Sequence, residues 1–462
     1  MSLFINREAE LTALERFYSS PGAQFVVIWG RRRIGKTELV KQFVKGKPNY
    51  IYMAKVLPTA AQVDHFLRSF CESISEPVPK ISDWKRAFEF VLNRIGAKQR
   101  TKRKVVLAID EFPYAIQGDP ATLSYFQELW DNFLSKRRDV MLILLGSSIS
   151  MMESYVLGYK SPLYGRRTGQ IKLEKLGLRH VRKFFPGWTF KDIIYAYSVL
   201  DGIPAYLLAF DPKLDIWTNI KNGFLNFSNF LFQEPQILIK EELREPINYA
   251  RILEAIAAMN FKVVDIANAI QMPAYNLPKY LRTLEELGFI KKVSPVTSKK
   301  PKVRETLYKL GDNFLNFYFR YIYPYMTDIN AGRTDFVLER IRKDIDLYVS
   351  KFIFENICME FLQLKPPVRF EEIGTFWKKD VEIDIVAINE HSGDVCFGEC
   401  KWADNVDAAA LLNELKAKAE VVPWKIGARK EHYILFARSF KRKLTEKNVY
   451  CFDLRDIERG LK

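Results

Sequence analysis

The sequence is poor in the residues that build disulfide frameworks and histidine metal sites. Its 462 residues include five cysteines and four histidines. The cysteines are Cys71, Cys358, Cys396, Cys400 and Cys451, and no two of them form a C-x-x-C motif. This sparse spacing favours a reducing compartment and argues against a structural zinc site. Four histidines also leave little material for a metal site built on imidazole.

The sequence also lacks a long uncharged apolar run. No such run approaches the roughly 20 residues that a membrane-spanning helix needs. The most apolar candidate, residues 314–326, is interrupted by Arg320 and Pro324. The first residues show neither the charged nor the apolar region of a secretory signal. We therefore expect a cytoplasmic protein that has no membrane as a partner.

Length and charge set broad limits on the organisation. A chain of 462 residues is too long for a single hydrophobic core, so we expect about two to four domains. The formal net charge of +16 suggests a polyanionic partner, with nucleic acid as the first choice and an anionic membrane surface as the second. The alternative is a basic protein without such a partner.

Residues 30–37 read Gly-Arg-Arg-Arg-Ile-Gly-Lys-Thr and fit the phosphate-loop pattern G-x-x-x-x-G-K-[ST]. An apolar run at 25–29 predicts a buried parallel strand before the loop, and 38–43 has helical spacing after it. Glycines allow close backbone approach, so consecutive N–H groups can face phosphate oxygens. The predicted nucleotide-binding residues are Gly30, Arg31, Arg32, Arg33, Ile34, Gly35, Lys36, Thr37 and Glu38.

The loop predicts ATP and Mg2+ as cofactors. Lys36 would reach the β- and γ-phosphates in a catalytic role, and the Thr37 hydroxyl would be a Mg2+ ligand. The x positions of the motif accept any residue, so solvent exposure is the default expectation for the three arginines. A contact of these arginines with DNA or another partner is the alternative.

A second apolar run, at 105–109, is followed by two carboxylates. Ligands of open α/β sheets lie at the carboxyl ends of strands. Asp110 would hold Mg2+, and Glu111 would orient or deprotonate the attacking water. The alternative is a strand that ends in solvated acids.

A third apolar run, at 140–145, is followed by Gly146, Ser147 and Ser148. One of the two serines would contact the γ-phosphate or the lytic water, and we take Ser147 as the candidate. A turn, or the cap of the next helix, is an equally good interpretation.

These motifs resemble those of archaeal P-loop ATPases of the AAA+/STAND type. The matching segments are residues 4–11, 30–37, 109–111, 145–148, 161–168 and 201–207. The resemblance implies a parallel sheet in which a sensor strand separates the Asp-Glu strand from the phosphate-loop strand. It also implies a helical lid over the nucleotide.

The resemblance also implies an arginine-bearing segment at 161–168. Arg166 or Arg167 would stabilise charge on a γ-phosphate, in cis or from a neighbouring subunit of a homo-oligomer. A solvated basic turn is the alternative for both arginines.

Residues 241–330 have the pattern of a winged helix-turn-helix domain. Short helical patterns around residue 252, at 263–270 and at 275–287 precede two predicted strands at 289–293 and 305–310. Lys279 and Arg282 would lie on the exposed face of the recognition helix. The loop between the strands carries Lys299, Lys300, Lys302 and Arg304. We expect DNA as the partner through phosphate contacts, and an interdomain adaptor is the alternative.

The last third brings acids and a lysine onto neighbouring strands. Residues 381–386 alternate, so Glu382 and Asp384 share a face, and by the same period Glu399 and Lys401 share a face. Together Asp384, Glu399 and Lys401 form a cluster that can bind one or two Mg2+ ions. The lysine would lower the pKa of a water molecule or stabilise the charge on phosphorus.

This arrangement resembles the PD-(D/E)XK nuclease fold. By that resemblance Asp384 and Glu399 are metal ligands with catalytic roles, Lys401 is the catalytic lysine, and Glu355 is the acid of the first helix. The chain departs from the pattern because Ile383, and not proline, precedes Asp384. A nuclease fold kept without cleavage is the alternative.

We therefore predict an α/β protein with a P-loop ATPase sheet, a helical lid, a winged helix-turn-helix and a C-terminal restriction-endonuclease-like domain. The predicted domains are residues 1–172, 173–240, 241–330 and 331–462. The expected function is Mg2+-dependent ATP binding and hydrolysis that acts on or is regulated by DNA, with a possible nuclease activity. The alternative is a nucleotide-operated STAND-like switch or scaffold that binds a protein or DNA partner without cleavage.

Overall fold

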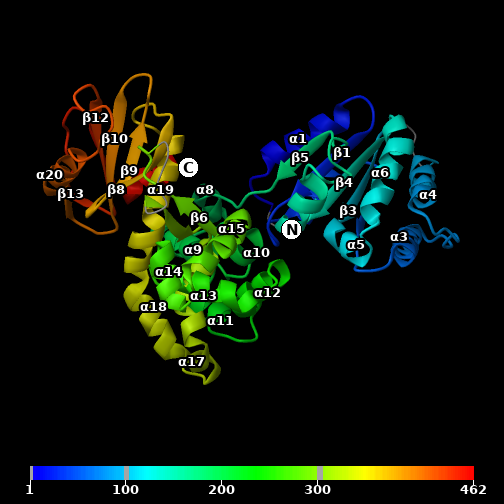
Figure 1. The fold of residues 1–462 in the computed structure, drawn as a ribbon, viewed down its shortest axis with the longest axis horizontal. Helices are drawn as coiled ribbons and strands as arrows, with labels where there is room; N and C mark the ends of the chain where they lie inside the picture. The colour runs from blue at the N-terminus through cyan, green and yellow to red at the C-terminus, as the bar shows by residue number, and fades with distance from the viewer. Residues whose placement is uncertain (1–3, 98–102, 299–304, 462) are drawn as a thin grey trace. The chain divides into compact units, whose positions relative to one another are not determined.

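The described chain divides into two compact units. The computed structural model describes residues 4–97, 103–298 and 305–461. The first unit is Met1–Lys175 with Ile203–Ala205, and the second is Leu176–Gly202 with Tyr206–Lys462 (Figure 1). The predicted boundary at residue 172 lies close to the end of the first unit. The boundaries predicted at 240 and 330 stay predictions.

A parallel sheet forms the centre of the first unit. Its strands are β1 (Gln24–Trp29), β2 (Asn49–Met53), β3 (Val105–Asp110), β4 (Val140–Gly146) and β5 (Gly169–Lys172). They lie in the order β2-β3-β4-β1-β5, and each neighbouring pair is parallel. The sensor strand was expected to separate the Asp-Glu strand from the phosphate-loop strand. This order is confirmed, because β4 lies between β3 and β1.

Helices cover this sheet. They are α1 (Glu8–Ser19), α2 (Lys36–Phe43), α3 (Thr59–Ile74), α4 (Trp84–Ala97), α5 (Phe112–Gly118), α6 (Thr122–Asn132) and the short α7 (Ile149–Met151). Every residue of β1, β3 and β4 is buried, as expected for strands covered on both faces. Phe25 and Val27 join the core beneath α3 to α6, whereas α1 contacts β1 from the opposite side (Figure 1).

The second unit begins with a helical region. Its helices are α8 (Leu178–Val181), α9 (Phe190–Leu200), α11 (Ile216–Phe224), α12 (Phe230–Glu242), α13 (Pro246–Ala257), α14 (Val263–Ile270), α15 (Leu277–Glu286), α16 (Asn313–Tyr321), α17 (Met326–Asn330) and α18 (Thr334–Tyr348). The short α10 (Pro204–Leu207) begins in the first unit and ends in the second. The aromatic segment at α16 is almost entirely buried and forms core.

An antiparallel hairpin of β6 (Ile290–Val293) and β7 (Leu307–Leu310) follows α15. It pairs Ile290 with Leu310 and Lys291 with Lys309. The lysines and the arginine expected in the connecting loop, Lys299, Lys300, Lys302 and Arg304, lie outside the described residues. Three helices and a hairpin thus occur in the predicted order.

The chain ends in a mixed sheet with the order β14-β12-β10-β9-β8. Its strands are β8 (Glu372–Lys378), β9 (Val381–Ile388), β10 (Asp394–Lys401), β12 (Lys430–Ala437) and β14 (Val449–Phe452). A small pair, β11 (Val406–Asp407) and β13 (Phe440–Arg442), lies outside this sheet. Strands β8 to β10 are antiparallel, and β10, β12 and β14 are parallel.

Two helices cover the opposite faces of this second sheet. Helix α20 (Ala408–Ala419) packs Leu411 and Leu415 against Phe397. Helix α19 (Phe354–Leu364) packs Phe361 against the rings of Phe436 and Phe452 on the other face, next to α21 (Leu454–Gly460) (Figure 1). The π-helical turn η7 (Val349–Ile353) joins α18 to α19.

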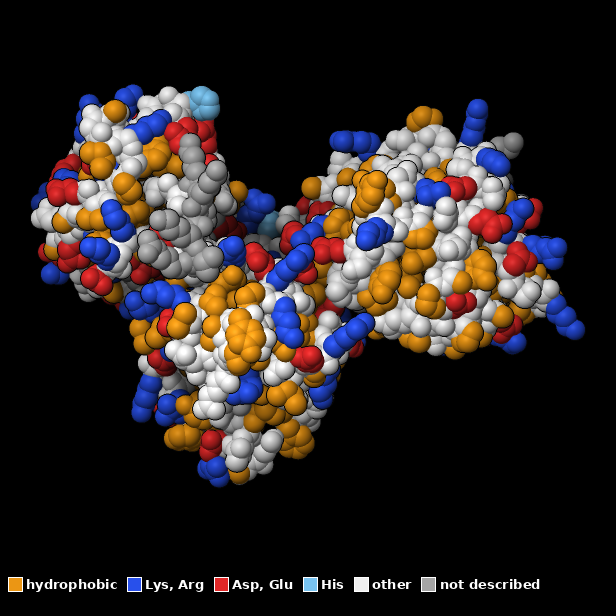
Figure 2. All heavy atoms as spheres, viewed as in Figure 1, with side chains coloured by type: hydrophobic (Ala, Val, Ile, Leu, Met, Phe, Trp, Pro, Cys, Tyr) orange, Lys and Arg blue, Asp and Glu red, His pale blue; other side chains and the backbone are white. Residues whose placement is uncertain are grey.

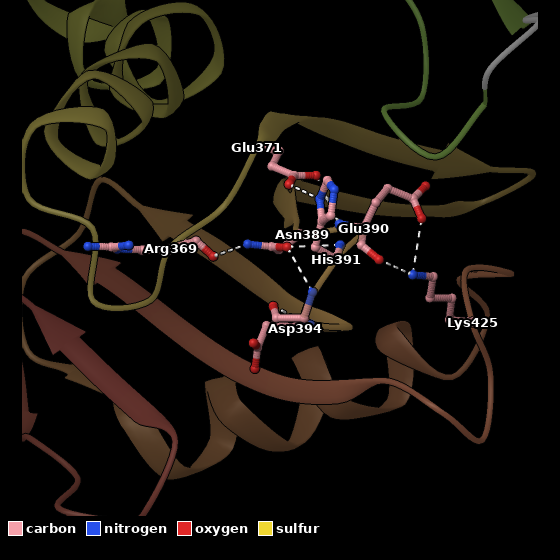
Figure 3. A network of polar contacts seen from close by, with 8 residues as sticks. Arg369, Glu371, Asn389, Glu390, His391, Asp394 and Lys425 are labelled. Carbon is pink, nitrogen blue, oxygen red and sulfur yellow. Dashed lines mark hydrogen bonds and ion pairs between the residues drawn. The ribbon is translucent and has the colours of Figure 1, made fainter.

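The turn between β9 and β10 is held by a polar network (Figure 3). The Asn389 side chain accepts hydrogen bonds from the backbone N–H groups of His391 and Ser392, each at 3.0 Å. Glu371 contacts the His391 ring, and Lys425 donates to the Glu390 carbonyl at 2.5 Å. The turn fixes the register of β9 and β10, and therefore the alignment of the acids farther along these strands.

Positive charge is spread over the surface. On the face drawn in Figure 2, Lys and Arg side chains lie among Asp and Glu side chains and do not form one continuous patch. In the part of the chain that the structure describes, no helix is long and apolar enough to cross a membrane.

Candidate nucleotide site and C-terminal acid cluster

The phosphate loop connects β1 to α2 in a conformation that requires glycine. Gly30 has a φ of 149° and Gly35 a φ of 98°. A Cβ atom at Gly30 would lie 2.5 Å from the carbonyl oxygen of Leu173, a distance that no side chain tolerates. The loop therefore exposes main-chain amides at the N-terminus of α2, which is the arrangement that binds phosphate groups.

Lys36 is the first residue of α2 and is only 6% exposed. Its Nζ donates to the carbonyl oxygens of Gly30 at 2.9 Å and Arg31 at 3.1 Å. The ammonium group is thus held inside the loop, where it fits a polyphosphate ligand. Arg31, Arg32 and Arg33 are partly buried, so the default expectation of solvent exposure is wrong. For Arg31 the buried atoms include Nε and Nη2 of the guanidinium group.

Thr37 and Asp110 meet across the end of the sheet. The Thr37 hydroxyl donates to Asp110 Oδ2 at 2.5 Å, and Asp110 is 1% exposed. A buried carboxylate beside a hydroxyl supplies hard oxygen donors, the chemistry that Mg2+ prefers. The structure thus brings together the two residues predicted to bind the metal, and their role as ligands stays a prediction.

Glu111 lies beside Ser147 on the neighbouring strand end. Glu111 has a left-handed backbone with a φ of 51°, and its N–H donates to Asp110 Oδ1 at 2.9 Å. The Ser147 hydroxyl donates to Glu111 Oε2 at 2.7 Å, and the Ser147 N–H donates to the same oxygen at 3.3 Å. Ser148 instead caps α7 by accepting from the Met151 N–H. Ser147 is therefore placed to orient the Glu111 carboxylate.

Arg166 is engaged inside its own unit. Its Nε and Nη2 bind the Asp131 carboxylate of α6 at 2.9 Å and 2.8 Å, and its Nη1 donates to the Pro162 carbonyl at 2.6 Å. Arg167 donates to the Leu157 carbonyl and lies over the Tyr164 ring. An action of Arg166 on a γ-phosphate would require its release from Asp131.

Arg7 contacts the phosphate loop, although the sequence patterns did not predict it as a site residue. Its buried guanidinium donates to the carbonyl of Ile34 in the phosphate loop at 3.2 Å and to that of Glu174 at 2.9 Å. It also pairs with Glu10 at 3.0 Å. The side chain therefore fastens α1 to the loop. The only signal in the sequence was its place in the matching segment 4–11.

The C-terminal cluster is formed on β9 and β10. Lys401 and Lys418 both donate to Glu399 Oε1, at 2.9 Å and 2.8 Å. Glu399 is 3% exposed, and in the described part of the chain its Oε2 has no hydrogen-bond partner. The Cys400 N–H donates to Asp384 Oδ2 at 2.8 Å. Lys418 comes from α20 and was not predicted, because no motif connects it to the strands.

Burial, and after it the charge of neighbouring acids, shifts the pKa values in this cluster. Burial, and then the charge of Glu399, raises the pKa of Asp384 to about 6. Burial, and then the charge of Asp384, raises the pKa of Glu355 on α19 to about 8. The structure thus brings Glu355 near the predicted cluster. A ready-formed group of three or more metal-binding side chains is not found among the described residues.

The parallel sheet, the phosphate loop and the paired acids define a P-loop ATPase. A family model described as an ATPase domain predominantly from Archaea matches residues 4–210. A second model, described as archaea bacterial proteins of unknown function, matches residues 318–417. The protein is accordingly a nucleotide-binding ATPase.

The full-length similarity identifies the family. The chain is 36% identical over 466 residues to the uncharacterized protein MJECL04 of Methanocaldococcus jannaschii. The alignment covers 98% of this chain and 100% of MJECL04. The chain belongs to the same family as MJECL04. A shorter stretch of 45 residues, 10% of this chain and 76% of the other, is 44% identical to the uncharacterized ATP-binding protein MJ0423 of the same organism.

A solved structure shares the fold. The match with the Walker-type ATPase paby2304 of Pyrococcus abyssi covers 69% of this chain and 96% of that one. Its TM-score is 0.52, and the sequence identity is 20%. At this identity the similarity concerns the fold.

Proposed function

We propose that the first unit hydrolyses ATP with Mg2+ and that this turnover acts on, or is regulated by, DNA bound by the second unit. The observation that carries the proposal is the buried Glu399 carboxylate beside Asp384 and Lys401, with one oxygen left without a partner. A buried unpaired carboxylate oxygen is costly. A divalent cation that brings a phosphodiester to the cluster would relieve this cost.

In the ATPase site, the loop from Gly30 to Glu38 would hold the triphosphate and Lys36 would bind its terminal phosphates. Thr37 and Asp110 would hold Mg2+, which supplies charge neutralisation when bound. Glu111, oriented by Ser147, would orient and deprotonate the attacking water. Arg166 would act on the nucleotide of a neighbouring subunit in a homo-oligomer.

Helices α13 to α15 with the β6–β7 hairpin would form the winged helix-turn-helix that binds DNA. Lys279 and Arg282 of α15 are exposed, which supports phosphate contacts. Lys279 lies over the Tyr280 ring, and Arg282 pairs with Glu286 on the same helix. Neither contact prevents these flexible side chains from reaching a partner.

In the C-terminal domain, Asp384 and Glu399 would be metal ligands of a PD-(D/E)XK nuclease site. Lys401 would be the catalytic lysine, and Glu355 would be the acid of the first helix. The raised pKa values of Asp384 and Glu355 fit a site that is completed by a cation.

A second function is favoured by the two lysines on Glu399. Lys401 and Lys418 already neutralise this carboxylate, so the cluster is balanced without a metal. The protein would then be a STAND-like switch or scaffold that binds DNA or a protein and does not cleave it.

Incubation of the full chain with ATP, Mg2+ or Mn2+, and linear, branched or single-stranded DNA tests both functions. Phosphate release and strand breaks are measured together. The first function predicts DNA-stimulated ATP turnover and metal-dependent nicking that Asp384→Ala abolishes, whereas Glu382→Ala, an exposed position on the same strand, keeps it. DNA-stimulated turnover without nicking supports the switch. ATP turnover that no DNA changes, together with no DNA binding, overturns the role of DNA.

A further inference from the structure

A cavity of about 230 Å³ lies between the β6–β7 hairpin and the C-terminal sheet. Its wall comes from β6, β7, α16, η7, α19 and β8, all within the second unit. The charged side chains that line it are Lys291, Lys309, Lys351 and Glu355. Among the described residues the lining thus has three lysines and one glutamate, so its formal charge is positive whatever the protonation state of Glu355.

The lysines are held together by the fold. Lys291 and Lys309 are direct partners across the hairpin, and like charges in that position destabilise a strand pair. Lys351 adds a third cation from η7. Such an accumulation costs free energy in the empty cavity, and a bound anion would remove that cost.

The hairpin wall is fastened to the sheet. The Val296 N–H donates to the Thr375 carbonyl of β8 at 3.0 Å. A Cβ atom at Gly374 would lie 3.1 Å from Val296 Cβ, so glycine permits this close approach. The two walls of the cavity therefore meet directly, and the cavity is a built feature of the unit.

Two buried polar atoms in the wall have no hydrogen-bond partner among the described residues. They are Thr375 Oγ1 and Asn316 Oδ1, and their residues are 5% and 3% exposed. Buried polar atoms are almost always paired. A hydroxyl donates to an anion, and an amide side chain carries both a donor and an acceptor at one end. The Thr375 hydroxyl can therefore donate to a phosphoryl oxygen, whereas Asn316 Oδ1 accepts and would pair with a donor such as a sugar hydroxyl.

We propose that this cavity binds a phosphoryl group, supplied by a nucleic-acid strand that enters the acid cluster. The inference rests on the proposed function, because Glu355 lies both in the cavity wall and near Asp384. Ligand pockets for drug-sized molecules hold roughly 300 to 1,000 Å³, so this smaller cavity fits a phosphoryl group with part of a sugar. Free phosphate is the other source of the same chemistry.

Lysine acetylation of the full chain, read by mass spectrometry, tests the cavity. The probes are a 5′-phosphorylated thymidine dinucleotide, the same dinucleotide without the terminal phosphate, and inorganic phosphate. We expect the phosphorylated dinucleotide to protect Lys309 and Lys351 and to leave Lys292, an exposed neighbour on β6, unprotected. Protection by both dinucleotides assigns the cavity to an internal phosphodiester, and equal protection by inorganic phosphate assigns it to a free anion. Each of these results supports phosphoryl binding.

Substitutions give a second measurement by calorimetry with the phosphorylated dinucleotide. Thr375→Val and Lys309→Gln should each weaken binding about tenfold, the effect of one hydrogen bond to a charged group. Lys292→Gln is the matched control and should bind as the wild type does. Thr375→Val removes a hydroxyl that has no partner within residues 4–97, 103–298 and 305–461, so no hydrogen bond between these residues is lost. Absence of protection by all three probes, or equal affinity of Thr375→Val and Lys292→Gln, overturns the proposal.

The two proposals fail separately. Protection of the lysines by a phosphorylated probe, with no effect of long DNA on ATP turnover or strand integrity, keeps the cavity and rejects the DNA function. If long DNA is nicked or stimulates ATP turnover but no probe protects the lysines, the DNA function is kept and the phosphoryl-binding cavity is rejected.

Discussion

Glu111 depends on a side chain from the neighbouring strand. Ser147 binds its carboxylate through both a hydroxyl and a main-chain N–H. A carboxylate held in one rotamer positions a water molecule more effectively than a mobile one. In the proposed mechanism Ser147 is a positioning residue, and its contribution should concern turnover more than nucleotide affinity.

We expect Ser147→Ala to lower kcat for ATP hydrolysis about tenfold with little change in KM, since one hydrogen bond that orients Glu111 is lost. Ser147→Thr keeps the hydroxyl and should restore most of the rate.

Glu111→Gln should keep ATP binding and lower kcat about 10²- to 10⁴-fold. Phosphate release measured across ATP concentrations separates the two parameters. Wild-type hydrolysis by Glu111→Gln would refute the assignment of the base.

The acids of the C-terminal cluster should make stability depend on pH. The pKa of Glu355 is raised from 4.5 to about 8 in the folded chain. Between these values the folded state holds a proton that the unfolded state has lost, so the free energy of unfolding falls as pH rises from about 4.5 to about 8. Asp384, with a pKa raised to about 6, adds to the same trend at the acidic end.

We expect Glu355→Gln to flatten this pH dependence, because glutamine cannot lose a proton. Urea unfolding of the full chain at several pH values measures the slope, with Glu372→Gln as the control on an exposed acid of β8. Equal slopes for wild type and Glu355→Gln would show that the carboxyl group titrates normally.

At the scale of elements, α18 connects the helical region of the second unit to its C-terminal sheet. Asp346 of α18 accepts hydrogen bonds from Tyr195 of α9 at 2.6 Å and from Trp402 after β10 at 2.7 Å. Arg438, after β12, binds the second oxygen of the same carboxylate at 3.1 Å. One side chain therefore joins three segments that are distant in sequence.

Asp346→Ala should destabilise the second unit by about 1–3 kcal/mol, because the buried polar groups of its partners lose an acceptor. Glu339→Ala on the same helix removes an exposed ion pair with Arg342 and should change stability by less than about 0.5 kcal/mol. Urea unfolding followed by tryptophan fluorescence gives both values. An effect of Asp346→Ala as small as that of the control would show that the junction is held by other contacts.

At the scale of the whole molecule, the chain has separate cores in its two units. The first core lies between the parallel sheet and its helices, and another lies between the C-terminal sheet and α20. Proteins with several such units commonly unfold in more than one step. A ligand stabilises the unit that binds it, by an amount that its concentration and affinity determine.

We expect two thermal transitions, of which ATP or a non-hydrolysable analogue raises one. At a ligand concentration of about 100 times Kd the shift corresponds to roughly 2.7 kcal/mol. Lys36→Ala should abolish both the shift and ATP hydrolysis, whereas Lys41→Ala, on the exposed face of the same helix, should keep both. Calorimetry measures the transitions. Equal shifts of both transitions in the wild type would show that the units unfold together.

Much of the first unit could be predicted from its sequence. Strands such as β1 and β4 are buried on both faces and must therefore be continuous apolar runs. The phosphate loop requires glycines because a Cβ atom would collide with the backbone at Gly30. Strand β5 was not predicted, because its four residues, Gly-Gln-Ile-Lys, lie at the sheet edge and carry no apolar pattern. In the C-terminal sheet, β8, β12 and β14 were also not predicted.

Local patterns in the chain were enough to predict the candidate site residues: the loop with Lys36 and Thr37, the strand that ends in Asp110 and Glu111, and the alternating acids of β9 and β10. Each pattern is set by the period of a strand or the geometry of a turn. Three other features came only from the folded chain: Arg7 binds the loop from 27 residues away, Lys418 shares Glu399 with Lys401, and a lysine-lined cavity lies beside Glu355. Such contacts join segments whose separation along the chain carries no pattern, since they arise when the packed cores bring distant surfaces together.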